Sequence, residues 1–199
     1  MEVKQLIVVR GAQGSGKSTE AAVWANHPKA RWYEADQIFE DRNGNYDFDA
    51  SWLHLAHDWC LRMVENALDN HEVERVVVSN CFATTEQIKP YVLAAKIRGA
   101  EVRVLLKFEK HPNEHGVPDR KVEAVRQRME PYIGEYICAS DKADMDRLVE
   151  TYPKYRDVYV DLPKGDGFEN LPRVVPAPGT PGFSDYALDR EPVYGEEDK

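Results

Sequence analysis

Short apolar runs alternate with longer amphipathic stretches over the first 160 residues of the chain. The apolar runs have the length and β-branched content of buried strands, and they lie at 3–9, 30–34, 75–80, 101–108 and 157–161. Between them, the sequence favours helices at 17–26, 51–70, 84–98, 119–129 and 141–150. Strands that alternate with helices predict the α/β class, with a doubly wound, mostly parallel five-stranded sheet.

Residues that favour the ends of helices mark several of these boundaries. Ser51 is a candidate N-cap for the long helix. Thr84 and Gln87 have the spacing of a capping box for the next helix, and Gly99 is a candidate C-terminal stop. The stretch 40–49 is rich in Asp, Asn and Gly, which predicts an irregular loop.

Periodicity and composition divide the chain into two parts. At 199 residues, with 42% hydrophobic and 31% charged positions, it has the size and composition of a globular domain, which we expect to span 1–162. Residues 163–199 lack periodicity and contain six of the twelve prolines, with eight acidic residues against four basic ones. We expect an extended, acidic, proline-rich tail that is either mobile or wrapped on the domain, with its own domain or another subunit as the candidate contact.

Charge and cysteine usage narrow the function classes. A net charge of −9 argues against indiscriminate coating of nucleic acid, although a small basic groove is compatible with it. The three cysteines form no C-x-x-C pair, the start of the chain does not resemble a signal peptide, and no apolar stretch approaches the length of a membrane span. We therefore expect an intracellular, cytoplasmic protein that does not contact a membrane.

The segment between the first strand and the first helix carries the clearest chemical signal. It matches G-x-x-x-x-G-K-[ST], the phosphate-binding loop (P-loop) of nucleoside triphosphatases. Its glycines let backbone N–H groups point at phosphate, Lys17 reaches the β- and γ-phosphates, and the Ser18 hydroxyl binds Mg²⁺. The sequence therefore predicts a P-loop NTPase that binds ATP and Mg²⁺. The candidate nucleotide-binding residues are Gly11, Gln13, Gly14, Ser15, Gly16, Lys17, Ser18 and Thr19.

Two polar residues follow predicted strands and converge with Lys17 at the carboxyl edge of the sheet, where such folds bind ligands. Asp36 is a candidate general base that accepts the proton of an attacking hydroxyl; the alternative is a helix cap or a solvated loop acid. Asn80 is a candidate metal ligand beside Ser18; the alternative is an ordinary polar residue at a strand end.

The charged helix predicted at 119–129 follows a proline-bounded loop and is a candidate lid. Arginines of such lids close on the transferring phosphate, and we single out Arg126 and Arg128 as candidate catalytic residues. A solvated helix face with Glu123 and Glu130 as partners is the alternative.

Histidines and aromatic residues add weaker signals. His54 and His57 have the spacing of a metal pair on a helix, although core or surface histidines are more common. An aromatic side chain from the set Trp32, Tyr33, Phe39 and Tyr46 is a candidate for stacking a base of a single-stranded substrate.

The sequence resembles the phage-type polynucleotide 5′-hydroxyl kinases over about residues 3–130. The stretches that carry the resemblance are the P-loop, Tyr33-Glu34-Ala35-Asp36 with Phe39, Gly44-Asn45-Tyr46-Asp47-Phe48-Asp49, Ala56-His57-Asp58-Trp59-Cys60, Val76 to Phe82, Asn113-Glu114-His115-Gly116-Val117-Pro118, and Arg128-Met129-Glu130. The resemblance implies transfer of the γ-phosphate of ATP to a 5′-hydroxyl of DNA or RNA. It also implies that Lys17 and Ser18 hold the triphosphate and metal, that Asp36 is the general base, and that a phage protein of this kind acts in the host cytoplasm.

The chain departs from that family at several positions. The phage enzyme has an arginine three residues after the base, where it grips the acceptor's phosphate; here Phe39 occupies this position, with Arg42 as a possible substitute. His115 stands near the expected lid arginine. The chain lacks the length for the phosphatase domain of the well-known phage enzyme, and 131–199 shows no likeness to the family.

Three other functions remain open on these residues. Loss of the phosphate grip suits a kinase of a hydroxymethylated base in phage DNA, which has to be flipped out of the duplex. The acidic net charge suits a small-molecule kinase. A nucleotide-dependent switch that does not phosphorylate an acceptor, with the tail binding a partner, belongs to another class.

Overall fold

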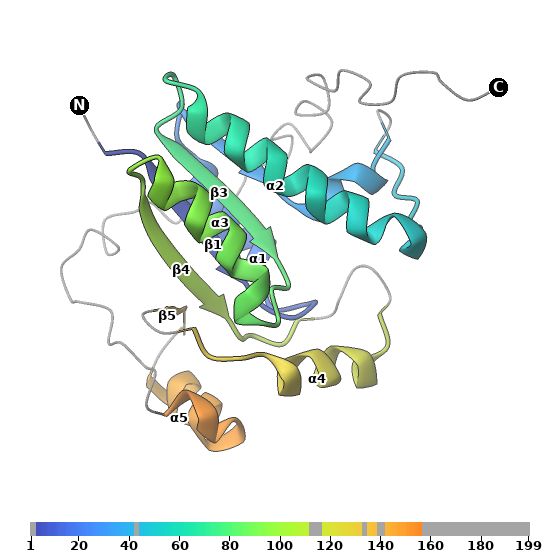
Figure 1. Cartoon of the computed structure of the whole chain (residues 1–199). Helices are drawn as coiled ribbons and strands as arrows, with labels where there is room; N and C mark the ends of the chain where they lie inside the picture. Colours follow the sequence, from blue (N-terminus) through green and yellow to red (C-terminus); the bar gives the residue numbers. More distant parts are fainter. Residues whose placement is uncertain (1–2, 42–43, 112–116, 133–134, 139–141, 157–199) are drawn as a thin grey trace.

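The computed structural model describes residues 3–41, 44–111, 117–132, 135–138 and 142–156. A five-stranded sheet forms its centre, with every strand pair parallel and the order β2-β3-β1-β4-β5 (Figure 1). The strands are β1 (Gln5–Arg10), β2 (Ala30–Tyr33), β3 (Arg75–Asn80), β4 (Glu101–Lys107) and β5 (Tyr136–Cys138). The predicted α/β fold with a doubly wound sheet is therefore confirmed.

Five α-helices accompany the sheet in the described part of the chain: α1 (Lys17–Ala25), α2 (Leu53–Asp69), α3 (Thr85–Ile97), α4 (Asp119–Arg128) and α5 (Lys142–Thr151). Short 3-10 helices cover Ala35–Phe39, Ala50–Trp52 and Pro153–Tyr155. None of the helices that can be described is long and apolar enough to cross a membrane.

Side chains along each strand alternate between the two faces of the sheet, and each face packs against a different set of helices. In β1, Leu6 and Val8 are fully buried against the cluster that contains α2 and α3, whereas Ile7 and Val9 are buried against α1. Because helices cover both faces of the sheet, nearly every position of these strands is apolar. This explains why the strands appear in the sequence as continuous apolar runs.

Two local predictions turn out differently in the structure. The fifth strand of the sheet is Tyr136–Cys138, paired with Leu105 to Lys107 of β4, whereas the strand expected at 157–161 lies outside the described residues. Ser51 is not the cap of α2, because Asp49 accepts hydrogen bonds from the backbone N–H and the hydroxyl of Ser51, and the α-helix begins at Leu53. The tail expected at 163–199 also lies outside the described residues.

The capping box of α3 is confirmed. The backbone N–H of Thr84 donates to the Gln87 side chain at 3.1 Å, and the Thr84 side chain accepts from the backbone N–H of Gln87. The helix is therefore fixed directly after β3, so that the turn between them stays at the carboxyl edge of the sheet.

A buried ion pair ties the end of β1 to the segment after α4. Arg10 and Glu135 are both fully buried and lie 3.1 Å apart. The same guanidinium donates to the carbonyl oxygen of Glu130 at 2.8 Å and to that of Ala83 at 3.5 Å. Three segments far apart in the sequence thus meet directly beneath the P-loop.

Candidate active site

The P-loop joins β1 to α1 and is shaped by close backbone approach. A Cβ atom at Gly11 would lie 2.3 Å from the Ser15 Oγ and 2.6 Å from the carbonyl oxygen of Lys107, so a side chain is excluded there. Gly16 adopts φ = +81° at the start of α1, a left-handed conformation that glycine favours. The N-terminus of α1 therefore opens directly onto the loop, as an anion site requires.

The strands around the P-loop hold its backbone in place. Gly11 donates its N–H to the carbonyl oxygen of Cys81 at 3.3 Å, and His111 donates its N–H to that of Gly14 at 2.8 Å. The Ser15 hydroxyl and the Gln13 side-chain oxygen are buried and have no hydrogen-bond partner among the described residues. Such uncompensated polar groups in a glycine-rich cradle fit a site that a polar ligand completes.

One cavity of about 490 Å³ brings six of the twelve predicted site residues together. Lys17 and Ser18 line it from the start of α1, Asp36 from the segment after β2, Asn80 from the end of β3, and Arg128 from the end of α4. Gln13 is the sixth. The other six predicted site residues do not line this cavity: Gly11, Gly14, Ser15, Gly16, Thr19 and Arg126. Residues from four parts of the sequence therefore face one space.

Asn80 positions the segment that carries Asp36. Its side-chain oxygen accepts the backbone N–H of Ala35 at 2.9 Å, and its side-chain nitrogen donates to the Cys60 sulfur at 3.5 Å. Ala35 begins the 3-10 helix Ala35–Phe39, of which Asp36 is the second residue. Asn80 thus connects the end of β3 to the turn that follows β2.

Glu34 is a site residue that the sequence reasoning missed. It lies at the end of β2, lines the same cavity and is more than nine-tenths buried. The Ser79 hydroxyl donates to this carboxyl group and itself accepts from the Trp32 indole at 2.9 Å. Burial raises the pKa of Glu34 to about 7, while hydrogen bonds from Ser79 and Ser18 and the charge of Lys17 act in the opposite direction. A second acid therefore lies beside Lys17 and Ser18.

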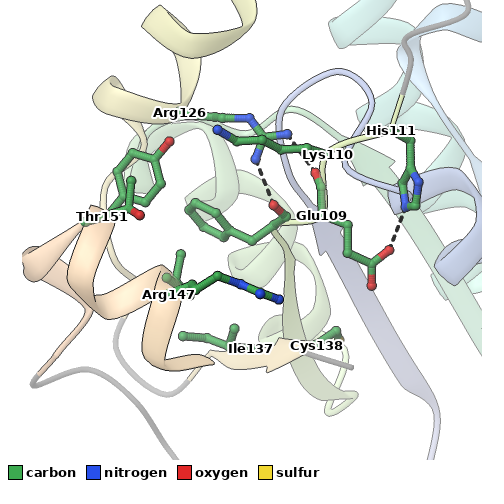
Figure 2. Close-up of a pocket in the computed structure, with 11 residues that line it drawn as sticks. Glu109, Lys110, His111, Arg126, Ile137, Cys138, Arg147 and Thr151 are labelled. Carbon is green, nitrogen blue, oxygen red and sulfur yellow. Dashed lines mark hydrogen bonds and ion pairs between the residues drawn. The ribbon is translucent and has the colours of Figure 1, made fainter. Parts of the chain in front are cut away.

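Arg126 lines a second cavity, of about 540 Å³, together with residues that follow β4 (Figure 2). Its guanidinium donates to the carbonyl oxygens of Phe108 at 2.8 Å and Glu109 at 2.7 Å, and lies 6.0 Å from the centre of the Phe108 ring. Figure 2 shows Arg126 entering from α4 and Arg147 from α5. The structure therefore brings Arg128, and not Arg126, to the cavity that contains Lys17.

The second cavity adjoins the P-loop through the segment that follows β4. Besides the His111–Gly14 hydrogen bond, a Cβ atom at Gly16 would lie 3.3 Å from a carboxylate oxygen of Glu109. The cavity wall includes the Phe108 ring and three cationic side chains, Lys110, Arg126 and Arg147. The sequence analysis did not identify this space, because its lining comes from the segment after β4, from α4, from β5 and from the region of α5.

The candidate histidine pair does not form a metal centre in the described residues. His57 lines the first cavity, where burial lowers its pKa below the ordinary value while Asp36 and Asp58 act in the opposite direction. Within the part of the chain that can be described, no group of three or more His, Cys, Asp or Glu side chains has an arrangement suited to hold a metal ion.

The glycine-rich loop between β1 and α1, in a parallel sheet of this strand order, defines a P-loop nucleotide-binding domain of the kinase-like type. The chain belongs to the AAA domain family, whose model matches residues 6–109. That span includes the P-loop, Asp36 and Asn80, and it ends directly after β4.

Individual relatives are distant. NEDD4-binding protein 2 from Homo sapiens is 26% identical over 145 residues, which cover 68% of this chain and 8% of that protein, so the chain spans only a small part of this relative. A proposed kinase from Chloroflexus aurantiacus J-10-fl has a TM-score of 0.50 at 15% identity, covering 79% of this chain and 98% of that one. A gluconokinase from Sinorhizobium meliloti 1021 has a TM-score of 0.45 at 15% identity, covering 79% and 94%.

Proposed function

We propose that the protein is an ATP- and Mg²⁺-dependent kinase that transfers the γ-phosphate to a hydroxyl of nucleic acid, most favourably a 5′-hydroxyl end. The observation that carries the proposal is that Lys17 of the P-loop and Asp36 after β2 line one cavity. A donor phosphate at Lys17 and an acceptor hydroxyl at Asp36 then share the space that in-line transfer needs.

The donor half consists of the P-loop and the start of α1. Its backbone N–H groups and Lys17 bind the triphosphate, and Arg128 approaches the transferring phosphate from the end of α4. The nucleobase lies in the second cavity, against the Phe108 ring and Arg147. That cavity adjoins Gly14 and Gly16 through the residues after β4, so one nucleotide can occupy both spaces.

The residues beside Lys17 fit a magnesium ion. Ser18 offers a hydroxyl, and Glu34 offers a buried carboxylate beside it, both of them oxygen ligands that Mg²⁺ prefers in proteins. When bound there, magnesium would supply charge neutralisation for the triphosphate. Asn80 acts as a positioning residue for the Asp36 segment, since its side-chain oxygen accepts the N–H of Ala35.

Asp36 is the general base of the proposed reaction. It accepts the proton of the acceptor hydroxyl and aligns the hydroxyl oxygen for attack on the γ-phosphorus. Phosphate is then transferred, and ADP leaves with the bond electrons of the cleaved P–O linkage. Arg126 has a different role: it fixes the carbonyl groups of Phe108 and Glu109, which line the second cavity.

The nucleic-acid acceptor is supported by the resemblance of residues 3–130 to polynucleotide kinases. A small-molecule kinase is the second candidate, and a specific observation favours it. Among the described residues that line the acceptor side of the first cavity, Asp36 and Glu40 are acidic and none is lysine or arginine. Such a lining suits an uncharged acceptor.

Transfer of radiolabelled γ-phosphate from ATP to several acceptors tests these candidate functions in one assay. The acceptors are a 5′-hydroxyl oligonucleotide, duplex DNA that contains hydroxymethylated bases, and free nucleosides. We expect label on the oligonucleotide. Label only on hydroxymethylated duplex or only on nucleosides would move the proposal to those acceptors. ATP hydrolysis without label on any acceptor would favour a nucleotide-dependent switch and contradict every kinase reading.

A further inference from the structure

We propose that the acceptor is held through its terminal nucleobase, which stacks on Tyr46 and Phe48, and not through a grip on its adjacent phosphate. This inference rests on the proposed kinase function and specifies how the same site recognises its acceptor. Both rings line the cavity that contains Lys17 and Asp36, yet both are largely exposed, at 42% for Tyr46 and 50% for Phe48.

A buried ring supports this aromatic pair from below. Phe39 ends the 3-10 helix that carries Asp36, and its own side chain is buried. Its ring makes edge-on contacts with Tyr46 at 6.2 Å and with Phe48 at 5.0 Å between ring centres. The position three residues after the proposed base therefore buttresses two exposed rings.

Backbone hydrogen bonds hold the loop that presents the rings. Asp47 donates its N–H to the carbonyl oxygen of Phe39 at 2.8 Å, and Glu40 pairs with Tyr46 as an isolated antiparallel bridge. Asn45 donates its N–H to the Asp41 side chain at 2.9 Å. Because these contacts hold residues 45–47 against residues 39–41, a stacking ligand meets a low entropic cost of binding.

The charges on this side of the cavity disfavour a phosphate. The described lining offers Asp36 and Glu40, and Asp47 and Asp49 flank the rings in sequence. His57 is held toward its neutral form by burial, which lowers its pKa. The two described lysine or arginine residues that line the cavity, Lys17 and Arg128, belong to the donor half. A neutral nucleobase is therefore a better ligand than a phosphate for the acceptor side of the cavity.

Stacking and phosphate contact have different experimental signatures. Stacking contributes per base and tolerates any base, because every base has a π face. Phosphate contacts make affinity fall steeply with salt, since they release counterions from the nucleic acid. The inference thus predicts an acceptor KM that depends on the presence of a terminal base but not on its identity, and only weakly on salt concentration.

The experiment compares acceptors and variants in one steady-state assay. The acceptors are a 5′-hydroxyl oligonucleotide and the same oligonucleotide with an abasic 5′-terminal residue. The variants are Tyr46→Ala combined with Phe48→Ala, the conservative Tyr46→Phe, and Trp52→Ala. Trp52 is the matched control, because it is an exposed aromatic residue close in sequence to the two rings, at the end of the 3-10 helix Ala50–Trp52, and it does not line the cavity.

We expect the double variant and the abasic acceptor each to raise the acceptor KM about tenfold or more, a range that stacking measurements support. The KM for ATP stays unchanged. Tyr46→Phe keeps an aromatic ring and raises the acceptor KM much less than the double variant, whereas Trp52→Ala behaves as the parent protein. Combining the double variant with the abasic acceptor adds no further loss, because both changes remove the same contact. Equal melting temperatures of all variants show that the fold is intact.

Two results separate failure of the inference from failure of the function. An enzyme that phosphorylates both oligonucleotides equally well, with an acceptor KM that rises steeply with salt, would overturn ring recognition and leave the kinase proposal standing. An enzyme that phosphorylates no nucleic acid at all would overturn the proposed function, and ring recognition with it.

Discussion

The donor and acceptor halves of the candidate site are built by opposite means. The donor half uses backbone: Gly11 and Gly16 shape the P-loop, and fully buried strand residues hold it from below. The acceptor half uses side chains on an irregular loop, with Tyr46 and Phe48 exposed and Asp36 fixed through Asn80. Triphosphate chemistry is the same in every P-loop protein, so a backbone cradle serves it, whereas the acceptor varies between proteins and is read by replaceable side chains.

Substitutions in the two halves should therefore have different effects on stability and activity. A substitution next to the P-loop alters a packed, buried region, so it should lower stability as well as activity. A substitution of an exposed side chain on the acceptor loop should weaken only the binding of the acceptor. Each of the following predictions tests one part of that contrast.

The largest expected effect separates Lys17 from Asp36. We expect Lys17→Ala to lower kcat/KM by roughly 10³-fold or more and to weaken ATP binding, because it removes charge stabilisation from the transferring phosphate. Asp36→Ala should lower kcat by roughly 10²- to 10⁴-fold with ATP binding intact. Steady-state kinetics and calorimetric titration with ATP check both. Lost ATP binding in Asp36→Ala would move Asp36 from the acceptor half to the donor half.

The buried ion pair beneath the P-loop gives the next effect. Glu135→Ala leaves Arg10 buried without its carboxylate, which should lower the free energy of unfolding by roughly 3–5 kcal/mol. Replacing both residues, Arg10→Met with Glu135→Leu, is the matched control and should cost much less, because no charge stays buried. Urea denaturation of the protein without nucleotide measures both. Equal losses in the single and double variants would contradict an unpaired-charge origin.

Glu34 should make stability depend on pH in a defined direction. Its pKa lies near 7 in the folded protein and at an ordinary, lower value when unfolded, so between these values the folded state binds more protons. Stability from this group is therefore present at low pH and is lost as pH rises from about 4.5 through 7. Relative to the parent, Glu34→Gln should gain roughly 2–3 kcal/mol between pH 5 and pH 8 without metal or nucleotide. Denaturant midpoints at several pH values measure this, and parallel pH profiles would argue against a buried, titrating Glu34.

The smallest expected effects distinguish the two arginines of α4. Arg126→Met removes two hydrogen bonds from carbonyl oxygens after β4 and should lower the free energy of unfolding by roughly 1–3 kcal/mol. Arg128→Met should leave stability almost unchanged and lower kcat, because Arg128 lines the Lys17 cavity. Thermal melts and kinetics on both variants provide the comparison. The reverse pattern would exchange the roles of the two side chains.

How far the sequence predicts this structure depends on the range of the interactions involved. β1 and β3 were predicted because continuous apolar runs suffice to identify strands buried on both faces. The P-loop was predicted because its spacing is local. β5 was not, since its three residues are too few to show a period, and its place depends on pairing with Leu105 to Lys107.

The site residues show the same limit. Glu34 precedes Asp36 by two residues, but its burial and its contact with Ser79 exist only because β2 pairs with β3, with Tyr33 opposite Val78. For α4 the sequence predicted the helix but not its rotation. Two residues along a helix are separated by about 200°, so Arg126 and Arg128 face different cavities.

The Arg10–Glu135 pair also has a consequence for biosynthesis. Glu135 follows Arg10 by 125 residues, and Glu130, which supplies another acceptor to the same guanidinium, is nearly as late. At about 5–20 residues per second, the ribosome needs roughly 6–25 seconds to make the partner after Arg10 itself. During this interval the nascent chain carries a cation that has no buried carboxylate to meet it. The nucleotide-binding loop is thus translated well before the segment that completes the ion pair next to it, and it reaches its final form only after that segment has been made.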